Sequence, residues 1–344
     1  MATGTGVRNG AAAKPVVSFG EAMLRLTPPR HEPLERALSL DISPGGAELN
    51  SAVTAAALGV PAVWVSCLPE NPLGRNLARQ ALASGVDLSR VRWIPDEDGR
   101  MGLYFLEEGA DPRPSAVTYD RAASAFARIA PGAFDWEAIL AEAGALHISG
   151  ITPAVGEGPR AETGAAIRAA NKLGVPVAFD LNYRSKLWSE AEARACFVEV
   201  VPQVDILFAS RSGLRTFFGL DGTYEEVLTQ AHERLGLATT VLSRKKGKTS
   251  REVRLGSVAM GQDGQVIEGP WRSVEVVDRL GGGDAFAGAF LAGYVRHPED
   301  LARCVALGGA AQALKHTMHG DFLIATREQI EAAVADTEGG VLQR

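Results

Sequence analysis

Residues 276–288 read VVDRLGGGDAFAG, a short apolar segment that runs into three consecutive glycines and then into a helix of small residues. Glycine lets the backbone turn with few steric limits and lets a ligand approach the main chain closely. The first turn of the following helix offers N–H groups without partners and the positive end of the helix dipole, and both favour an anion. The spacing therefore predicts a phosphate-binding turn at Gly281, Gly282 and Gly283, with Asp284 at the start of the helix.

Asp284 has a simpler interpretation, in which it only caps the helix and the glycines form a tight turn. One cap does not require three glycines, so phosphate binding is the favoured interpretation. An ionised Asp beside a bound phosphoryl group can accept the proton of an attacking hydroxyl. The N–H groups then stabilise the negative charge that develops on the transferred group.

Upstream of this turn, short apolar strands alternate with helices. Strands are expected at residues 15–20, 62–66, 145–149, 175–180, 206–208 and 239–242, and helices at 49–58, 73–83, 160–173 and 191–200. Two more helices, 285–295 and 301–314, are expected to close the chain. This alternation predicts right-handed βαβ units, a mainly parallel central sheet and a three-layer α/β domain.

Two stretches break this rhythm because they are strand-like with no helix between their strands. They cover about residues 21–43 and 91–121, and within the first, residues 38–43 alternate as a half-buried strand should. We expect them to form a small β-sheet that covers a site. Residues 1–14 are rich in Gly, Ala and Thr and are expected to be a disordered leader, and residues 335–344 a C-terminal tail.

The composition excludes several classes of protein. The 344 residues carry 35 Lys and Arg against 41 Asp and Glu, a net charge of −6, which argues against nucleic-acid binding. No apolar run approaches the roughly 20 residues that cross a bilayer. Residues 1–14 have no apolar segment of the kind found in a secretory signal, so none is expected there. The three cysteines are scattered, which favours the cytoplasm. An anionic ligand would need cations placed locally at its site.

A second polar group, DLNYRSKLW at residues 180–188, begins where an apolar strand ends. Ligands of open α/β sheets bind at the carboxyl ends of strands, and Arg184 could pair with a carboxylate or phosphate. The alternative is a surface Arg184 stacked on Trp188. His316 and His319 lack partners at metal-ligand spacing, so they are interpreted as solvated residues at a helix end, and no metal ligands are predicted.

Together these segments resemble the ribokinase-like (PfkB) carbohydrate kinases. Residues 281–286 resemble the GAGD signature of that family, and Gly45-Gly46 with Asn50 resembles its N-terminal di-glycine motif. Within the family, the sequence is most similar to 2-keto-3-deoxygluconate kinases, through residues 20–26, 113–115, 119–122, 149–154, 180–188 and 315–322. The resemblance covers about residues 15–334 and implies one ribokinase-like kinase domain with a small β-sheet lid.

The resemblance also implies roles for individual residues. Asp284 would be the catalytic base and Gly281, Gly282 and Gly283 the anion hole. Substrate contacts would come from Gly46, Asn50, Tyr104, Tyr119, Arg121, Arg184 and Asp321, with an arginine on the sugar-acid carboxylate, and nucleotide contacts from Asn182 and Ser210. ATP with Mg²⁺ would phosphorylate the terminal hydroxyl of 2-keto-3-deoxygluconate, giving 2-keto-3-deoxy-6-phosphogluconate. Subunits would pair through the lid as a homo-oligomer.

The sequence departs from the family pattern at two places. Ser210-Arg211-Ser212-Gly213 stands where the family usually has Asn-x-x-Glu, and residues 243–257 are unusually basic where relatives have a nucleotide-contacting loop. The missing acidic residue keeps open a weakly catalytic sugar or nucleotide sensor. A kinase for a neutral sugar of the fructose or ribose type, which would not need arginines at its substrate, also stays open. The sequence does not distinguish gluconate-derived from galactonate-derived substrates.

Overall fold

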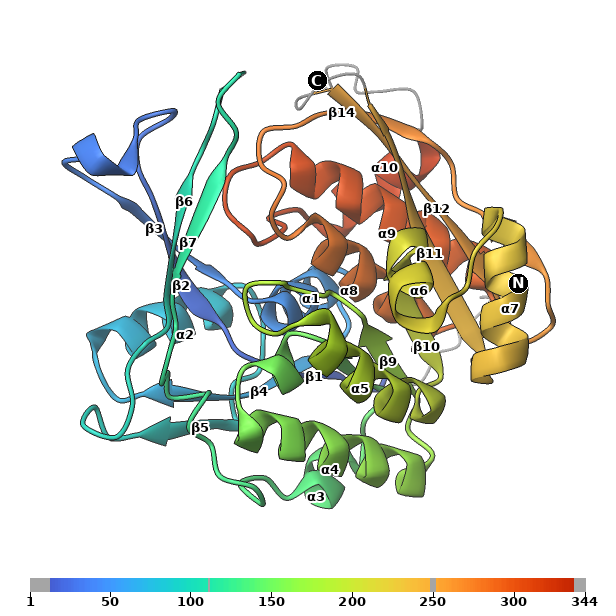
Figure 1. Ribbon diagram of the computed structural model, residues 1–344, viewed down its shortest axis with the longest axis horizontal. Coiled ribbons are helices and arrows are strands. Elements are labelled where there is room, and N and C mark those ends of the chain that lie inside the picture. The colour runs from blue at the N-terminus through green and yellow to red at the C-terminus, as the bar shows by residue number, and fades with distance from the viewer. Residues whose placement is uncertain (1–12, 111, 248–251, 337–344) are drawn as a thin grey trace, which may run out of the picture.

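The computed structural model describes residues 13–110, 112–247 and 252–336 and consists of a three-layer α/β body with a small sheet at one side (Figure 1). Residues 1–12 of the expected leader and 337–344 of the expected tail lie outside the described residues. None of the described helices is both long enough and apolar enough to cross a membrane.

The central sheet is mainly parallel, as the alternation of strands and helices predicts. Its ten strands follow the order β13-β12-β11-β10-β9-β8-β1-β4-β5, with β14 also paired to β12. Strands β5 to β11 along this path pair in parallel, whereas β12 is antiparallel to its neighbours. The bounds are β1 Val16–Phe19, β4 Ala62–Pro69, β5 Val91–Ile94, β8 Ala145–Ser149, β9 Val177–Asp180, β10 Ile206–Ser210, β11 Thr239–Gly247, β12 Glu252–Met260, β13 Val266–Glu268 and β14 Arg272–Glu275.

Helices cover both faces of this sheet, so the three-layer prediction is confirmed. One face carries α1 Ala47–Ala57, α2 Pro72–Ala83, α8 Gly282–Tyr294, α9 Leu301–His316 and α10 Arg327–Ala335. The other carries α3 Trp136–Leu140, α4 Glu157–Leu173, α5 Glu190–Val200, α6 Arg211–Phe218 and α7 Tyr224–Leu235. Successive strand residues enter opposite cores, as Val16 and Val17 do, because side chains alternate across a strand. Short 3₁₀ turns occur at Leu34–Arg36, Thr152–Ala154 and Val201–Gln203.

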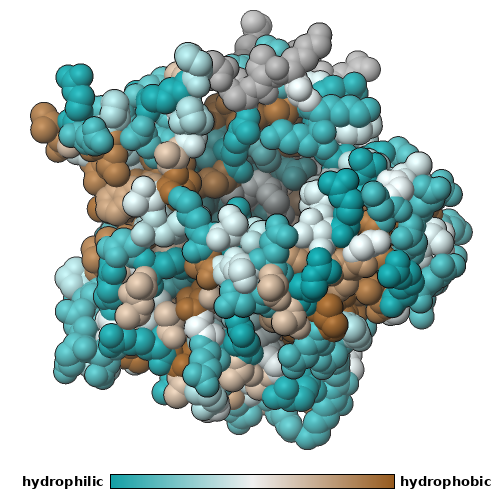
Figure 2. Space-filling model, in the orientation of Figure 1, coloured by the Kyte–Doolittle hydropathy of each residue, from teal (hydrophilic) through white to brown (hydrophobic). Residues whose placement is uncertain are grey.

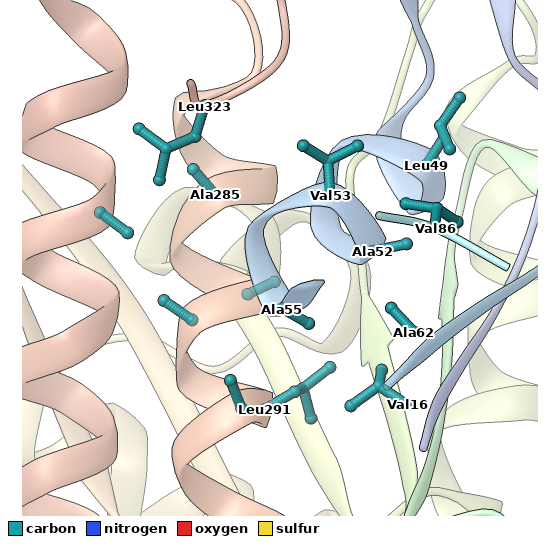
Figure 3. Packing of buried hydrophobic residues seen from close by; sticks show 14 of the residues in the cluster. Val16, Leu49, Ala52, Val53, Ala55, Ala62, Val86, Ala285, Leu291 and Leu323 are labelled. Carbon is teal, nitrogen blue, oxygen red and sulfur yellow. The ribbon is translucent and has the colours of Figure 1, made fainter. Parts of the chain in front are cut away.

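Helices α1 and α8 pack closely on one face of the sheet, where Leu49 of α1 and Leu291 of α8 are fully buried (Figure 3). Burial of each such side chain contributes about 2 kcal/mol. A Cβ at Gly288 of α8 would lie 2.2 Å from the backbone oxygen of Ser51 in α1, so only glycine permits this approach. The two helices therefore bring residues of their first turns into direct contact.

The small sheet has the order β3-β2-β6-β7, formed by Asp41–Gly45, Met23–Thr27, Leu103–Glu107 and Ala116–Asp120. Strand β2 is antiparallel to β3 and parallel to β6, and β6 and β7 form an antiparallel pair. The stretch 91–121 divides between the two sheets, because Val91–Ile94 pairs with β4 in the central sheet. Sequence alternation alone does not say which sheet receives a strand.

Two local expectations are wrong. The strand expected at residues 38–43 begins at Asp41, and Leu38 and Ile42 are exposed rather than half-buried. The reason is that β3 is an edge strand, paired only with β2 in the small sheet. A third helix, α10, follows the two that were expected to close the chain; it begins at a capping box formed by Thr326 and Gln329.

Candidate functional site

Two cavities lie on either side of the glycine turn. The small-sheet cavity, of about 420 Å³, lies between the small sheet and the first turns of α1 and α8, and Gly281 and Asp284 line it. The strand-end cavity, of about 400 Å³, lies at the ends of β9 and β10, and Gly283 lines it. Tyr183 lines both cavities. The arrangement places Asp284 and its turn between two volumes that can each hold a small molecule.

The glycine turn leaves the start of α8 bare. Gly281 is the N-cap residue, with φ of 78°, and no side chain among the described residues caps the helix. The N–H of Ala285 donates to the oxygen of Gly281 at 2.8 Å, so the earlier N–H groups of the first turn have no partner within the helix. A Cβ at Gly281 would lie 2.0 Å from the oxygen of Asp321, whereas one at Gly283 would meet no atom of the part of the chain that the structure describes within 4 Å. The turn is thus tightly held on one side and open to the strand-end cavity on the other.

Asp284 does not cap its helix, so the simpler interpretation of this residue is wrong. It lies in the first turn of α8, where Nδ2 of Asn50 donates to its Oδ2 at 2.7 Å. The hydroxyl of Ser51 donates to the backbone oxygen of Asp284 at 3.0 Å. Burial raises the pKa of Asp284 to about 6, against the opposing effects of the Asn50 hydrogen bond and the charge of Arg184. Such a carboxylate is ionised at neutral pH and suited to accept a proton.

The residues predicted to bind the substrate meet in the small-sheet cavity. Gly46, Asn50, Tyr104, Tyr119, Arg121, Arg184 and Asp321 all line it beside Asp284. The hydroxyl of Tyr104 donates to Asp321 at 2.7 Å, and the rings of Tyr104 and Tyr119 lie 6.0 Å apart. Burial together with the Asp321 carboxylate raises the pKa of Tyr104 well above its usual value, so this phenol stays a donor. The structure brings this set together, and the individual roles stay predictions.

The cations of this cavity differ in their partners. Arg121 forms an ion pair with the buried Glu21 and lies over the ring of Tyr119. Lys186 donates to the oxygen of Val117 at 2.5 Å. Within residues 13–110, 112–247 and 252–336, the side chain of Arg184 has no hydrogen bond or ion pair, so its charge is available to an anion in the cavity.

The alternative for Arg184, stacking on Trp188, is wrong. The cation that lies over the ring of Trp188 is Arg160, at 5.7 Å from the ring centroid. Arg184 instead lines the small-sheet cavity, and its charge lowers the pKa of both Asp180 and Asp284.

The two residues predicted to contact the nucleotide line the strand-end cavity. Asn182 follows β9 with φ of 31°, a conformation that Asn tolerates better than most residues. Ser210 ends β10 and caps α6, where its Oγ accepts from the N–H of Gly213 at 3.0 Å. Apolar Phe208 and Phe286 line the same cavity. A cavity with apolar rings and polar groups in its lining suits a ligand that has a flat apolar ring with polar substituents.

Two carboxylates near Asp284 were not assigned a role from the sequence: Glu48, which is fully buried, and Asp180, which lines the strand-end cavity. Burial raises the pKa of Glu48 to about 7, although its Oε1 accepts from the N–H of Ser149 at 2.8 Å and from the hydroxyl of Thr152 at 2.7 Å. Burial and the negative charges of Asp284 and Glu48 raise the pKa of Asp180 to about 7. The sequence signal for Glu48 is its place two residues after Gly46, in the first turn of α1.

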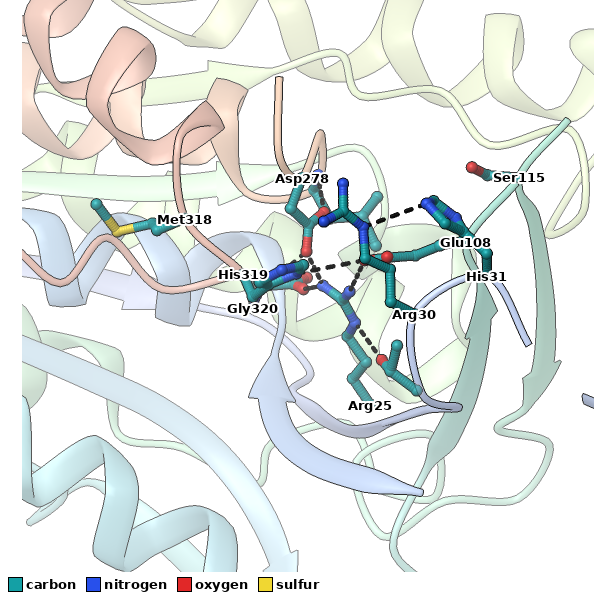
Figure 4. Close-up of polar contacts among 12 residues, drawn as sticks. Arg25, Arg30, His31, Glu108, Ser115, Asp278, Met318, His319 and Gly320 are labelled. Carbon is teal, nitrogen blue, oxygen red and sulfur yellow. Dashed lines mark hydrogen bonds and ion pairs between the residues drawn. The ribbon is translucent and has the colours of Figure 1, made fainter. Parts of the chain in front are cut away.

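Arg25 was also missed, although it interrupts the apolar pattern of β2. Its Nη1 lies 2.6 Å from Oδ2 of Asp278 (Figure 4) and 2.9 Å from Oδ1 of Asp321. Side-chain atoms of Glu108, Asp278 and His319 that could bind a metal ion also lie within 4.8 Å of one another. Arg25 already places a positive charge beside Glu108 and Asp278, which disfavours a metal cation there.

The expectation that His316 is solvated is wrong. The residue is buried, and its Nδ1 lies 2.7 Å from the oxygen of Gln312. A Cβ at Gly282 would lie 2.2 Å from Cε1 of His316, so the imidazole packs against the glycine turn. His319 is exposed, as expected for a residue at a helix end.

Comparison with known proteins agrees with this arrangement. A 2-dehydro-3-deoxygalactonokinase from Haloferax volcanii is 39% identical over 326 residues, which cover 95% of this chain and 98% of that protein. A 2-dehydro-3-deoxygluconokinase from Thermoproteus tenax is 28% identical and covers 89% of each chain.

The fold of a solved relative is also very similar. The crystal structure of 2-dehydro-3-deoxygluconokinase from Thermotoga maritima superposes with a TM-score of 0.89 and 34% identity, covering 94% of this chain and 99% of that one. The family described as pfkB family carbohydrate kinase matches residues 13–323, which include both cavities and the glycine turn. The chain therefore belongs to the pfkB family of carbohydrate kinases.

Proposed function

We propose that the protein transfers the terminal phosphoryl group of ATP to the terminal hydroxyl of a 2-keto-3-deoxy sugar acid. Its first substrate would be 2-keto-3-deoxygluconate, with 2-keto-3-deoxy-6-phosphogluconate as the product. The observation that carries the proposal is the place of Asp284, in the open first turn of α8 between the two cavities. The galactonate-derived epimer is the second candidate, since the Haloferax volcanii relative is a galactonokinase by name.

In this proposal the sugar acid lies in the small-sheet cavity and ATP in the strand-end cavity. Asp284 accepts the proton of the terminal hydroxyl while that oxygen forms a bond to the γ-phosphorus, and the bond to the ADP oxygen breaks. Asn50 keeps the Asp284 carboxylate in one orientation through its 2.7 Å hydrogen bond. The N–H groups of the glycine turn stabilise the charge on the transferred group, which is usually the largest single contribution to catalysis.

Arg184 would hold the carboxylate of the sugar acid. It lines the small-sheet cavity, and its charge is not taken by an ion pair with another described residue. Lys186 adds a second positive charge at the same wall. A neutral sugar would not need these cations, so the charges favour an acid over a sugar of the fructose or ribose type.

A magnesium ion that accompanies ATP has suitable oxygen donors in the strand-end cavity. Asp180 and Glu190 line it, and the crowding of Asp180 by the charges of Asp284 and Glu48 creates an environment that favours a cation. These carboxylates would take the place of the acidic residue that Ser210–Gly213 lacks. Such an ion supplies neutralisation of the phosphate charge during transfer.

The small sheet would act as a lid and as the contact with a second copy of the chain. Figure 2 shows hydrophobic side chains gathered over the small sheet. Leu38 is fully exposed there and Ile42 is half exposed. A second small sheet would bury these side chains, and exposed apolar patches of this kind mark interaction sites.

The experiment that tests the proposal is a coupled assay of ADP release with a panel of acceptors. It compares kcat/KM for 2-keto-3-deoxygluconate, its galactonate-derived epimer, fructose and ribose. We expect kcat/KM for the two acids to exceed kcat/KM for the neutral sugars by a large factor. A higher kcat/KM for fructose or ribose would show that the substrate is a neutral sugar and not an acid. Binding of a sugar or nucleotide in calorimetry without turnover would favour a sensor.

A further inference from the structure

Arg25 joins the small sheet to the glycine turn at residues 281–283 through buried ion pairs. We propose that it is a positioning residue for phosphoryl transfer, which fixes the turn before α8 and the carboxylate of Asp321 relative to the small sheet. The inference rests on the proposed function, because it concerns the same two cavities. Arg25 lines neither of them, so it acts through the residues that it holds.

The contacts of Arg25 are numerous and shielded from water. The side chain projects from β2 and is 2% exposed. Its Nη1 donates to Asp278 at 2.6 Å and to Asp321 at 2.9 Å, and its Nε donates to Oγ1 of Thr27 at 2.8 Å. Nη2 lies 3.8 Å from Oε1 of Glu108, the residue that follows β6 (Figure 4). A guanidinium presents several donors in a fixed plane, so it can hold two carboxylates at a set angle.

Asp278 carries the effect of Arg25 to the glycine turn. Its Oδ1 accepts from the N–H of Leu280 at 3.0 Å, and its Oδ2 accepts from the N–H of Gly320 at 3.1 Å. Leu280 immediately precedes Gly281, the N-cap residue of α8. The position of the Asp278 carboxylate therefore determines how the chain enters the turn that precedes Asp284.

Asp321 carries the effect of Arg25 to the substrate side. Its Oδ2 accepts from the hydroxyl of Tyr104 at 2.7 Å, and its side chain lines the small-sheet cavity. Its backbone oxygen lies where it would be 2.0 Å from a Cβ at Gly281, so Asp321 also packs on the turn. The guanidinium of Arg25 thus links a wall of the small-sheet cavity to the glycine turn.

Loss of the guanidinium would leave like charges facing one another. Asp278 and Asp321 would repel, and Asp284 adds a third negative charge nearby that acts on Asp321. Buried Lys315 partly compensates, because its charge interacts with all three carboxylates. Charges in a poorly solvated interior repel strongly, so the turn and Asp321 would move apart. A displacement of about 1 Å at such a site can cost about 100-fold in rate.

The test compares wild type with Arg25→Ala, Arg25→Lys and the control Arg113→Met. Arg113 pairs with Glu107 and donates to the oxygen of His31 at 2.6 Å, so its contacts are confined to the small sheet and its adjoining loops. The first measurement is kcat and KM with the acceptor that wild type uses best. The second is amide hydrogen exchange at residues 278–284 and 318–322. The third is the response of Arg25→Ala to added guanidinium ion.

The proposal expects Arg25→Ala to lower kcat about 100-fold, with a smaller change in the KM for ATP. Arg25→Lys should be intermediate, because an ammonium is a point charge that cannot hold both carboxylates in one plane. Hydrogen exchange should become faster in both segments, and millimolar guanidinium should restore at least part of kcat. Arg113→Met should stay within about twofold of wild type, as a surface ion pair contributes little.

A folded Arg25→Ala with kcat near that of wild type, or with unchanged exchange at residues 278–284, would overturn the proposal. If Arg25→Ala does not fold, Arg25→Lys decides: a lower kcat at an unchanged melting temperature supports the proposal, and an unchanged kcat rejects it. Wild type that turns over no sugar acid rejects the proposed substrate instead. The hydrogen-exchange comparison still decides the role of Arg25 in that case.

Discussion

Asn50 of α1 and Asp284 of α8 are 234 residues apart in sequence and are joined by a hydrogen bond of 2.7 Å at the boundary of the two cavities. The contact depends on the close packing of the two helices, since Gly288 of α8 lies directly on the backbone of Ser51. Both helices begin at a glycine, Gly46 and Gly281, and no side chain of residues 13–110, 112–247 or 252–336 caps either of them. The site therefore combines two bare helix starts with one oriented carboxylate.

The first prediction concerns the pH dependence of turnover. Because the pKa of Asp284 is raised to about 6, the base form is present above pH 6 and is lost as the pH falls through this value. The acid limb of kcat/KM at saturating ATP should have its midpoint there. Asn50→Ala removes a hydrogen bond that lowers this pKa, so its acid limb should move to higher pH. Asn171→Ala on α4 is the matched control, and an acid limb that is the same in all three proteins would contradict the assignment.

The second prediction concerns recognition of the acid. Arg184→Met should raise the KM for the sugar acid about tenfold or more, because a hydrogen bond to a charged group contributes about 1.5 to 3 kcal/mol. The KM for ATP should change little, since Arg184 lines the small-sheet cavity. Steady-state kinetics with each substrate varied in turn measures both constants. Arg100→Met, which removes an exposed ion pair with Asp120, is the control. Equal KM values for the sugar acid in wild type and Arg184→Met would show that a residue other than Arg184 binds the substrate carboxylate.

The third prediction concerns stability and follows from Glu48. Burial raises its pKa from 4.5 to about 7 in the folded protein. The folded protein therefore keeps the Glu48 proton to a higher pH than the unfolded chain does. The contribution of Glu48 to the free energy of unfolding thus falls as the pH rises from about 5 to 8. Glu48→Gln cannot ionise, so its stability relative to wild type should improve by about 2 kcal/mol over this range. Urea unfolding at pH 5 and pH 8 measures the difference, and a constant difference between the two proteins would refute the argument.

The fourth prediction concerns assembly through the small sheet. Leu38→Glu places a charge on a fully exposed leucine of the expected contact, whereas Leu82→Glu does so on the exposed face of α2. Light scattering coupled to gel filtration should show a homo-oligomer for wild type and for Leu82→Glu, and a smaller species for Leu38→Glu. A monomeric wild type, or a Leu38→Glu variant of unchanged mass, would exclude this contact.

Local sequence patterns predicted the layered body and the glycine turn because both are encoded over short distances. A βαβ unit needs about thirty residues, and the turn at residues 281–283 needs only its own glycines and the helix that follows. The partners of Asp284 were harder to predict, because Asn50 reaches it only through the packing of α1 on α8. The resemblance to a known family supplied that residue, and the structure supplied its contact.

Tertiary contacts account for what the sequence could not predict. Arg25 and Asp278 are 253 residues apart, and nothing in their local patterns connects them. Val91–Ile94 has the alternation of any short strand, and only the position of β4 assigns it to the central sheet. His316 has the sequence context of a solvated helix end but is buried against Gly282. In each case the deciding partner lies far along the chain.

The fifth prediction tests the claim that Asp284 is the base for phosphoryl transfer. The measurement is kcat for ADP release with 2-keto-3-deoxygluconate in wild type, Asp284→Asn and the control Asp263→Asn, which alters an exposed turn. Asn keeps the shape of the side chain but cannot accept the proton, so kcat should fall about 1000-fold, while Asp263→Asn should match wild type. An Asp284→Asn protein that is folded and retains kcat within about tenfold of wild type would contradict the account.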